Sequence, residues 1–167
     1  MKSEINLTKH CRILDKYIFF LNGPLCQWFK SDMKEDGILF NCCEQYMMYH
    51  KAMLFNDEET ASKILLSSEP REQKSFGRQV KNFNEIVWES QREQTVFKGN
   101  YLKFTQNENL KEYLKRTSPY ILVEANKHDR IWGIGMFQDD PNILNIDRWG
   151  LNLLGKTLMK VREQIFK

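Results

Sequence analysis

The sequence predicts a mainly α-helical protein, a single-domain helical bundle with a few short β-strands. The C-terminal segment has the clearest helical pattern, because its apolar side chains recur at alternating spacings of three and four. These positions are Leu151, Leu154, Leu158, Val161 and Ile165. Residues 43–55 are apolar on nearly every side, as in a helix buried at the centre of a bundle. Only short segments are aromatic or β-branched enough to form strands.

Length and composition are those of one globular domain. The chain has 167 residues, of which 41% are apolar and 28% are charged, and it is long enough to bury a core. The net charge of +3 comes from 25 basic and 22 acidic residues. This small excess argues against a protein that coats nucleic acid electrostatically, although nucleic acid remains possible as a substrate. We expect residues 1–15 to form an irregular or partly helical N-terminal arm and residues 16–167 a single domain.

Three segments are expected to form short strands. Residues 16–21 are aromatic and β-branched, and the Asn22-Gly23-Pro24 sequence that follows forces a turn. Residues 33–37 are expected to be a polar turn before a second short strand at 38–40. The third strand is 120–125, and it leads into a polar loop at 126–142.

The other helices begin at recognisable signals. Asn41 is a candidate cap for the central helix, and Asn56 with Glu59 resembles a capping box for the next one. Pro70 suits the first turn of a further helix, and Gly99 is a possible interruption of a longer one. The expected helices span residues 43–55, 56–66, 70–77, 84–104 and 108–116, followed by the C-terminal helix.

The central helix carries two ionisable residues, Glu44 and Lys51, among large apolar side chains. Seven residues make nearly two helical turns, so both side chains leave the same face, about 10 Å apart along the axis. That spacing suits two groups that flank one ligand. Ionised groups on a buried helix are costly unless they are paired or face a cavity. A structural partner for each residue, or a path to the surface, is the equally open alternative.

A second candidate region runs from the third strand into its loop. The strand ends in Glu124, and the loop presents Asp129 and Trp132 beside Gly133 and Gly135. Loops held by strands often carry binding residues, and Trp132 could stack on a nucleobase. A core tryptophan followed by a tight turn is the alternative. The glycines do not form a GxGxxG motif, so no dinucleotide-binding Rossmann site is inferred.

A third region, residues 19–29, places Asn22, Cys26 and Gln27 among aromatic side chains. By itself this pattern is equally well explained by a turn followed by core aromatics. Basic residues are spread over the middle helices and are either phosphate contacts or part of a solvated face. They are Lys74, Arg78, Arg92 and Lys103.

Other classes of site lack support in the sequence. The chain has four cysteines without a CxxC pair and three histidines without an HExxH motif, so no metal site is expected. The N-terminus shows no apolar targeting segment, and no run is long enough to span a membrane. We therefore expect an intracellular, cytoplasmic protein without a cofactor, and we infer no membrane or stable protein partner.

Taken together, these segments resemble the NADAR family over nearly the whole chain, from Phe19 to about Arg162. Several short motifs carry the resemblance through their order and spacing. They are Gly23 to Phe29 (GPLCQWF), Glu44-Gln45-Tyr46 with Lys51-Ala52, Pro70, Lys74 with Gly77-Arg78, Trp88, Arg92, Lys103-Phe104 with Gln106-Asn107, Leu122-Val123-Glu124, Asp129, Trp132 to Gly135, and Asn152 to Gly155.

The resemblance implies a largely helical, metal-independent N-glycosidase. Its implied substrates are ADP-ribose linked to guanine, or ribosylamino-pyrimidine phosphates of riboflavin biosynthesis. The implied catalytic residues are Glu44, Lys51 and Asp129. The implied ligand-binding residues are Asn22, Cys26, Gln27, Trp28, Arg78, Glu124, Trp132, Gly133 and Asn152. This chain has Cys26-Gln27 where the family often has Ser-Asn, a departure that bears on substrate preference.

The leading hypothesis is removal of ADP-ribose from guanine in nucleic acid or a nucleotide. Hydrolysis of reactive riboflavin precursors is a second hypothesis. A non-catalytic module that only binds ADP-ribose is a third, and it has little need of both Glu44 and Lys51. Cleavage of the ribose–nitrogen bond suits these residue types, because a carboxylate stabilises the positive charge that develops on the sugar in the transition state. A lysine with a lowered pKa can attack the anomeric carbon and hold the opened sugar as a Schiff base.

Overall fold

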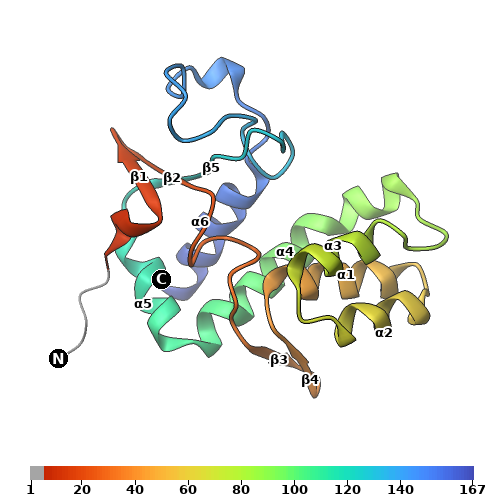
Figure 1. The fold of residues 1–167 in the computed structure, drawn as a ribbon. Coiled ribbons are helices and arrows are strands. Elements are labelled where there is room, and N and C mark those ends of the chain that lie inside the picture. Colours follow the sequence, from red (N-terminus) through yellow and green to blue (C-terminus); the bar gives the residue numbers. More distant parts are fainter. Residues whose placement is uncertain (1–5) are drawn as a thin grey trace. The chain divides into compact units, whose positions relative to one another are not determined.

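A computed structural model describes residues 6–167, in which the chain forms two compact units. The first unit comprises the described residues up to Cys26 together with Glu108–Lys167, and the second comprises Gln27–Asn107. The described residues contain six α-helices and five short strands (Figure 1), so the predicted mainly α fold with a few strands is confirmed. Within this part of the chain, no helix combines the length and apolarity needed to cross a membrane.

The first unit is built on a three-stranded sheet of order β1-β2-β5 (Figure 1). β2 (Tyr17–Phe20) and β5 (Ile121–Glu124) are the expected strands and pair in parallel. β1 (Cys11–Leu14) pairs antiparallel with β2 and follows a short 3-10 helix, η1 (Leu7–Lys9). The prediction of an irregular or partly helical segment missed β1. Asp15, at φ 53, makes the tight turn into β2, a conformation suited to short hairpins.

Two helices and a long loop complete the first unit. α5 (Glu108–Arg116) is confirmed, and α6 (Leu153–Ile165) packs on β5. α6 begins two residues after the expected Leu151, which is 49% exposed, because Asn152 is left-handed at φ 51 and interrupts the helix. The loop between β5 and α6 contains the 3-10 helix η2 (Ile146–Arg148). Its apolar side chains join Tyr17 and Phe19 in one core.

In the second unit, α1 (Cys43–Leu54) packs against α2 (Glu58–Leu66), α3 (Pro70–Gly77) and α4 (Glu85–Gln106) (Figure 1). A Cβ at Gly77 would lie 1.9 Å from Sδ of Met48, and one at Gly99 would lie 2.7 Å from the Tyr46 ring. These glycines let α3 and α4 approach α1 closely. α1 is therefore the buried central helix that its composition predicts.

Several local predictions in the second unit need correction. Residues 33–37 are not a simple polar turn, because β3 (Met33–Glu35) pairs with β4 (Ile38–Phe40) around Asp36 and Gly37. Both turn residues have positive φ, as a two-residue hairpin requires. α1 is capped by Cys42 rather than Asn41, and α2 by Asp57 rather than Asn56. α4 is capped by Asn84 and runs through Gly99 without a break.

Candidate active site

The first turn of α1 places Glu44 in a buried position. The Sγ atom of Cys42 accepts a hydrogen bond from the Gln45 amide, which starts the helix. The amide of Glu44 donates to the main-chain carbonyl of Gln27 at 3.0 Å, so the segment before β3 is joined to the helix N-terminus. The Glu44 side chain is 6% exposed. Its carboxylate lies at the end of the helix where the backbone dipole favours negative charge.

Burial changes the protonation of Glu44. Loss of hydration raises the pKa of this carboxyl from the ordinary 4.5 to about 7. The positive charge of Lys74, a hydrogen bond from the Trp28 side chain, and the charges of Lys51 and Arg78 oppose that rise. The result is a carboxyl that both accepts and donates a proton near neutral pH, which is the property required of a general acid–base group.

Lys51, in the last turn of α1, is the second ionisable group of this site. Its Nζ lies 4.5 Å from the centroid of the Phe83 ring and 5.8 Å from that of Trp88. Burial lowers the pKa of the Lys51 amine, attraction to Glu44 opposes this, and repulsion from Arg78 adds to it. A larger fraction of neutral amine, the nucleophilic form, is the consequence.

Trp28 and α3 supply further groups around Glu44. Trp28 is 39% exposed, and Nζ of Lys74 lies 6.0 Å from a ring centroid of this indole. Arg78 is exposed and caps the C-terminus of α3, directly after Gly77. Three cations therefore act on one carboxyl, and an aromatic surface lies beside it. This combination suits a ligand that has both a flat ring and an anionic group.

Gln27 is held by α4. Its Oε1 accepts a hydrogen bond from Nδ2 of Asn100 at 2.8 Å, and its Nε2 is buried without a hydrogen-bond partner among the described residues. Asn100 is itself fully buried. Asn22 and Cys26 belong to the first unit, where Asn22 is exposed and Cys26 is half-buried.

In the first unit, Glu124 ends β5 and is held from α6. Its amide donates to Oδ1 of Asn152 at 3.0 Å, and Nδ2 of Asn152 donates to the Leu122 carbonyl at 3.0 Å. Asn152 thus connects α6 to β5. A Cβ at Gly133 would lie 2.9 Å from the Glu124 carbonyl oxygen, so only glycine allows the loop to approach the strand this closely.

Asp129 organises the loop that follows β5. Its Oδ1 accepts hydrogen bonds from the amides of Ile131 and Trp132, both at 2.8 Å, and its carbonyl accepts one from Gly135 at 3.1 Å. The Trp132 ring is half-buried. The contacts of Asp129 support a role in loop structure, and its part in catalysis stays a prediction.

The structure gathers the predicted site residues into two groups, one in each unit. The second unit holds Gln27, Trp28, Glu44, Lys51 and Arg78. The first unit holds Asn22, Cys26, Glu124, Asp129, Trp132, Gly133 and Asn152. The two groups with altered pKa values, Glu44 and Lys51, both lie in the second unit.

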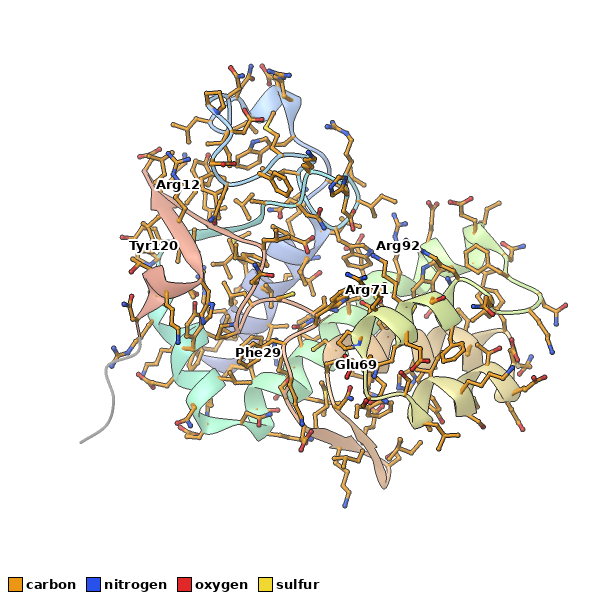
Figure 2. The ribbon with its side chains drawn as sticks, in the orientation of Figure 1. Arg12, Phe29, Glu69, Arg71, Arg92 and Tyr120 are labelled. Atoms are coloured by element: carbon orange, nitrogen blue, oxygen red, sulfur yellow. The ribbon has the colours of Figure 1, made fainter. Side chains whose placement is uncertain are left out.

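Sequence reasoning missed residues that act through others. Phe83 lies on a loop before α4, and nothing in its local pattern relates it to Lys51. Asn100 lies on the same helix face as Trp88 and Val96, at spacings that are multiples of four. A polar residue within this apolar stripe was the signal that could have indicated a buried polar contact. Lys103 is fully buried, with Nζ over the rings of Phe104 and of Phe29, which is labelled in Figure 2. The solvated-face interpretation is therefore wrong for this lysine.

No group of three or more His, Cys, Asp or Glu side chains within residues 6–167 is arranged to hold a metal ion. We therefore identify no metal centre in the described part of the chain.

Comparison with known proteins agrees with this fold. A model of the NADAR domain matches residues 19–166. N-glycosidase R617 of Acanthamoeba polyphaga mimivirus is 39% identical over 164 residues, covering 90% of this chain and 96% of that protein. Protein irg-1 of Caenorhabditis elegans is 35% identical, covering 86% and 69%. The NMR structure of the E. coli protein YbiA superposes with a TM-score of 0.74 at 29% identity, covering 92% of this chain and 87% of YbiA.

The chain is an enzyme of the N-glycosidase class, as its relatives R617 and YbiA are named. It belongs to the NADAR family, whose domain occupies nearly all of its length.

Proposed function

We propose that this enzyme removes ADP-ribose from guanine, in nucleic acid or a nucleotide, by hydrolysing the bond between the ribose and the base. The observation that carries the proposal is the pairing of Glu44 and Lys51 on one helix. Burial brings the pKa of Glu44 to about 7 and lowers that of Lys51. A protein that only bound the nucleotide would have little use for two groups with altered proton affinity.

Glu44 serves as the acid–base group. In its protonated form it donates a proton to the leaving base while the carbon–nitrogen bond breaks. The resulting carboxylate stabilises the positive charge that develops on the sugar. Its neighbours Lys74 and Arg78, with Trp28, suit the phosphates and the ring of the substrate.

Lys51 serves as the nucleophile. Its neutral amine adds to the anomeric carbon as the base departs, and transfer of the amine proton to the ring oxygen opens the sugar as a Schiff base. Water then adds to that carbon and releases the sugar and the free amine. The family resemblance also implies a catalytic role for Asp129 and a ligand-stacking role for Trp132.

Hydrolysis of ribosylamino-pyrimidine phosphates is the second candidate function. The riboflavin biosynthesis protein PYRR of Zea mays is 30% identical over 169 residues, covering 97% of this chain and 26% of that protein. That similarity favours riboflavin precursors as the alternative substrate class.

The deciding experiment incubates the protein, in the presence of EDTA, with an ADP-ribosylated guanine nucleotide, ADP-ribosylated DNA and the pyrimidine intermediates in parallel. Release of ADP-ribose from the guanine substrates supports the proposal, and turnover of the pyrimidines alone selects the second candidate. Binding of ADP-ribosylated guanine without release of product contradicts both. Loss of activity in EDTA with rescue by one divalent metal contradicts the metal-independent chemistry.

A further inference from the structure

The orientation of the Gln27 side-chain amide is determined by a chain of hydrogen bonds. Nδ2 of Asn100 donates to the Val96 carbonyl at 2.9 Å, one turn back on α4. The Oδ1 atom of Asn100 accepts from the Cys43 thiol at 3.5 Å. A backbone carbonyl cannot donate, so the nitrogen of Asn100 must be the atom that faces Val96. That nitrogen also faces Gln27, which must therefore present its oxygen, and the 2.8 Å bond joins these two atoms.

This arrangement leaves the Gln27 nitrogen without an acceptor. Nε2 is buried and has no hydrogen-bond partner among the described residues. A buried donor without an acceptor is costly, and native proteins rarely retain one without a reason. The amide cannot rotate to relieve the cost, because rotation would set the Asn100 nitrogen against the Gln27 nitrogen. Within the described residues, no rearrangement of these two amides supplies the missing acceptor.

The unpaired nitrogen belongs to the residue that contacts Glu44. The main-chain carbonyl of Gln27 accepts the Glu44 amide, and the adjacent Trp28 side chain hydrogen-bonds to the Glu44 carboxyl. Gln27 therefore lies beside the N-terminus of α1, which carries Glu44, the residue proposed to protonate the leaving base. Nucleobases differ in whether they offer a carbonyl oxygen or an amino group at such a point: guanine has an acceptor at O6, and adenine has a donor at N6.

We propose that Gln27 selects leaving bases that present a carbonyl oxygen, and that Asn100 and Cys43 are positioning residues that keep the Gln27 nitrogen facing this oxygen. The inference rests on the proposed removal of a sugar from a nucleobase and adds the feature of the base that is recognised. A base with an amino group at that point brings two donors together and leaves both unpaired, which is a strong basis for discrimination.

The test compares an ADP-ribosylated guanine nucleotide with its 2,6-diaminopurine counterpart, in which an amino group replaces the carbonyl oxygen. We expect the wild-type kcat/KM to favour guanine by about 10- to 100-fold. Gln27→Met keeps the shape of the side chain without the amide, so the ratio falls to within about threefold of unity. Gln94→Met, at an exposed glutamine of α4, retains the wild-type ratio.

A second measurement separates recognition from cleavage. The side-chain NH2 signals of Gln27 in a ¹⁵N spectrum should shift when the guanine compound binds and stay in place with the diaminopurine compound. Shifts without turnover support recognition and contradict the proposed cleavage. The inference is overturned if wild type and Gln27→Met each turn over both compounds equally and the NH2 signals do not move. In that case the proposed cleavage still stands. Absence of both binding and turnover overturns both.

Discussion

The amine of Lys51 lies 4.5 Å from the centroid of the Phe83 ring, and this contact acts on the lysine in two opposite ways. The face of the ring attracts the charged form of the amine. The ring also helps to keep water away, which favours the neutral form. Burial is the larger effect, because the pKa of Lys51 is lowered overall.

Phe83→Leu should lower the pKa of Lys51 further. Leucine keeps apolar cover over the amine but has no ring quadrupole, so the charged form loses about 0.5–1 kcal/mol of stabilisation. That loss corresponds to a fall of about 0.4–0.7 pKa unit. The pH dependence of acetylation of Lys51, followed by mass spectrometry, measures it. Phe83→Tyr keeps the ring and should behave as wild type, and a pKa that rises in Phe83→Leu would show that shielding is the main contribution of this side chain.

Lys51→Arg should abolish turnover. Arginine retains the positive charge but does not form an imine, because its guanidinium stays protonated. Borohydride should trap a sugar adduct on Lys51 of the wild type, detectable as a mass increase. Lys63→Arg, at an exposed lysine of α2, is the matched control and should trap normally. Substantial activity in Lys51→Arg without an adduct on the wild type would exclude the covalent route and leave Glu44 to direct water.

Glu44→Gln should reduce cleavage by about two to four orders of magnitude, the usual effect of losing an acid–base group. The glutamine keeps the shape of the side chain, so ligand affinity should change little. Single-turnover kinetics and calorimetry with the guanine substrate separate the two effects. A variant that cleaves at the wild-type rate would remove Glu44 from the mechanism.

The same substitution should stabilise the protein above neutral pH. The folded-state pKa of Glu44 is raised to about 7, so the folded protein binds more protons than the unfolded chain between about pH 4.5 and 7, and its stability falls as pH rises through that window. Between pH 4 and pH 8, the free energy of unfolding of the wild type should fall by up to about 3 kcal/mol more than that of Glu44→Gln. Urea unfolding at both pH values checks this.

The exposed Glu59 provides a control of opposite sign. Its hydrogen bonds and ion pairs with Lys63 and Lys81 lower its pKa to about 2. It therefore stabilises the folded state above the unfolded pKa, and this stabilisation is lost as pH falls through the folded pKa. Glu59→Gln should thus be slightly less stable than wild type at pH 8. An identical pH response of the two variants would show that burial of Glu44 is not the cause.

Gly99→Ala should destabilise the second unit by about 1–3 kcal/mol. The added methyl group would lie 2.7 Å from the ring of Tyr46, whose hydroxyl donates to Glu35 at 3.0 Å and so limits its movement. Thermal unfolding measures the change. Gln94→Ala, at an exposed position of the same helix, should change stability little. Equal stability of the two variants would mean that α4 moves away from α1 at no cost.

Trp132→Ala should weaken binding of the guanine substrate and leave the fold intact, because the half-buried ring is assigned to stacking. Trp149 is the matched comparison: it packs against Tyr17 and Phe19, and its indole donates to the Ile143 carbonyl at 2.8 Å. Trp149→Ala should cost about 3 kcal/mol or more. If Trp132→Ala unfolds as readily, the stacking assignment is wrong. Calorimetry and circular dichroism provide both measurements.

The positions of the helices, apart from their exact first residues, followed from periodicity and local signals in the sequence. Pro70 and Gly77 bound α3 as predicted, and the Leu154, Leu158 and Val161 stripe is buried in α6. The mispredicted features are those that depend on contacts with another residue or strand. β1 forms because β2 pairs with it, and α1 is capped by Cys42, whose Sγ accepts a hydrogen bond from the Gln45 amide.

The sequence alone determined that Glu44 and Lys51 share one helix and one face, because helical spacing is a local property. Only the tertiary structure decided the proton affinity and the surroundings of these two side chains. Their pKa values depend on burial and on charges from α3, and the lysine contacts rings that lie more than thirty positions further along the chain. The unpaired nitrogen of Gln27 likewise depends on Asn100, 73 residues away in sequence. Desolvation and hydrogen-bond geometry arise from packing between distant segments, and no local pattern encodes them.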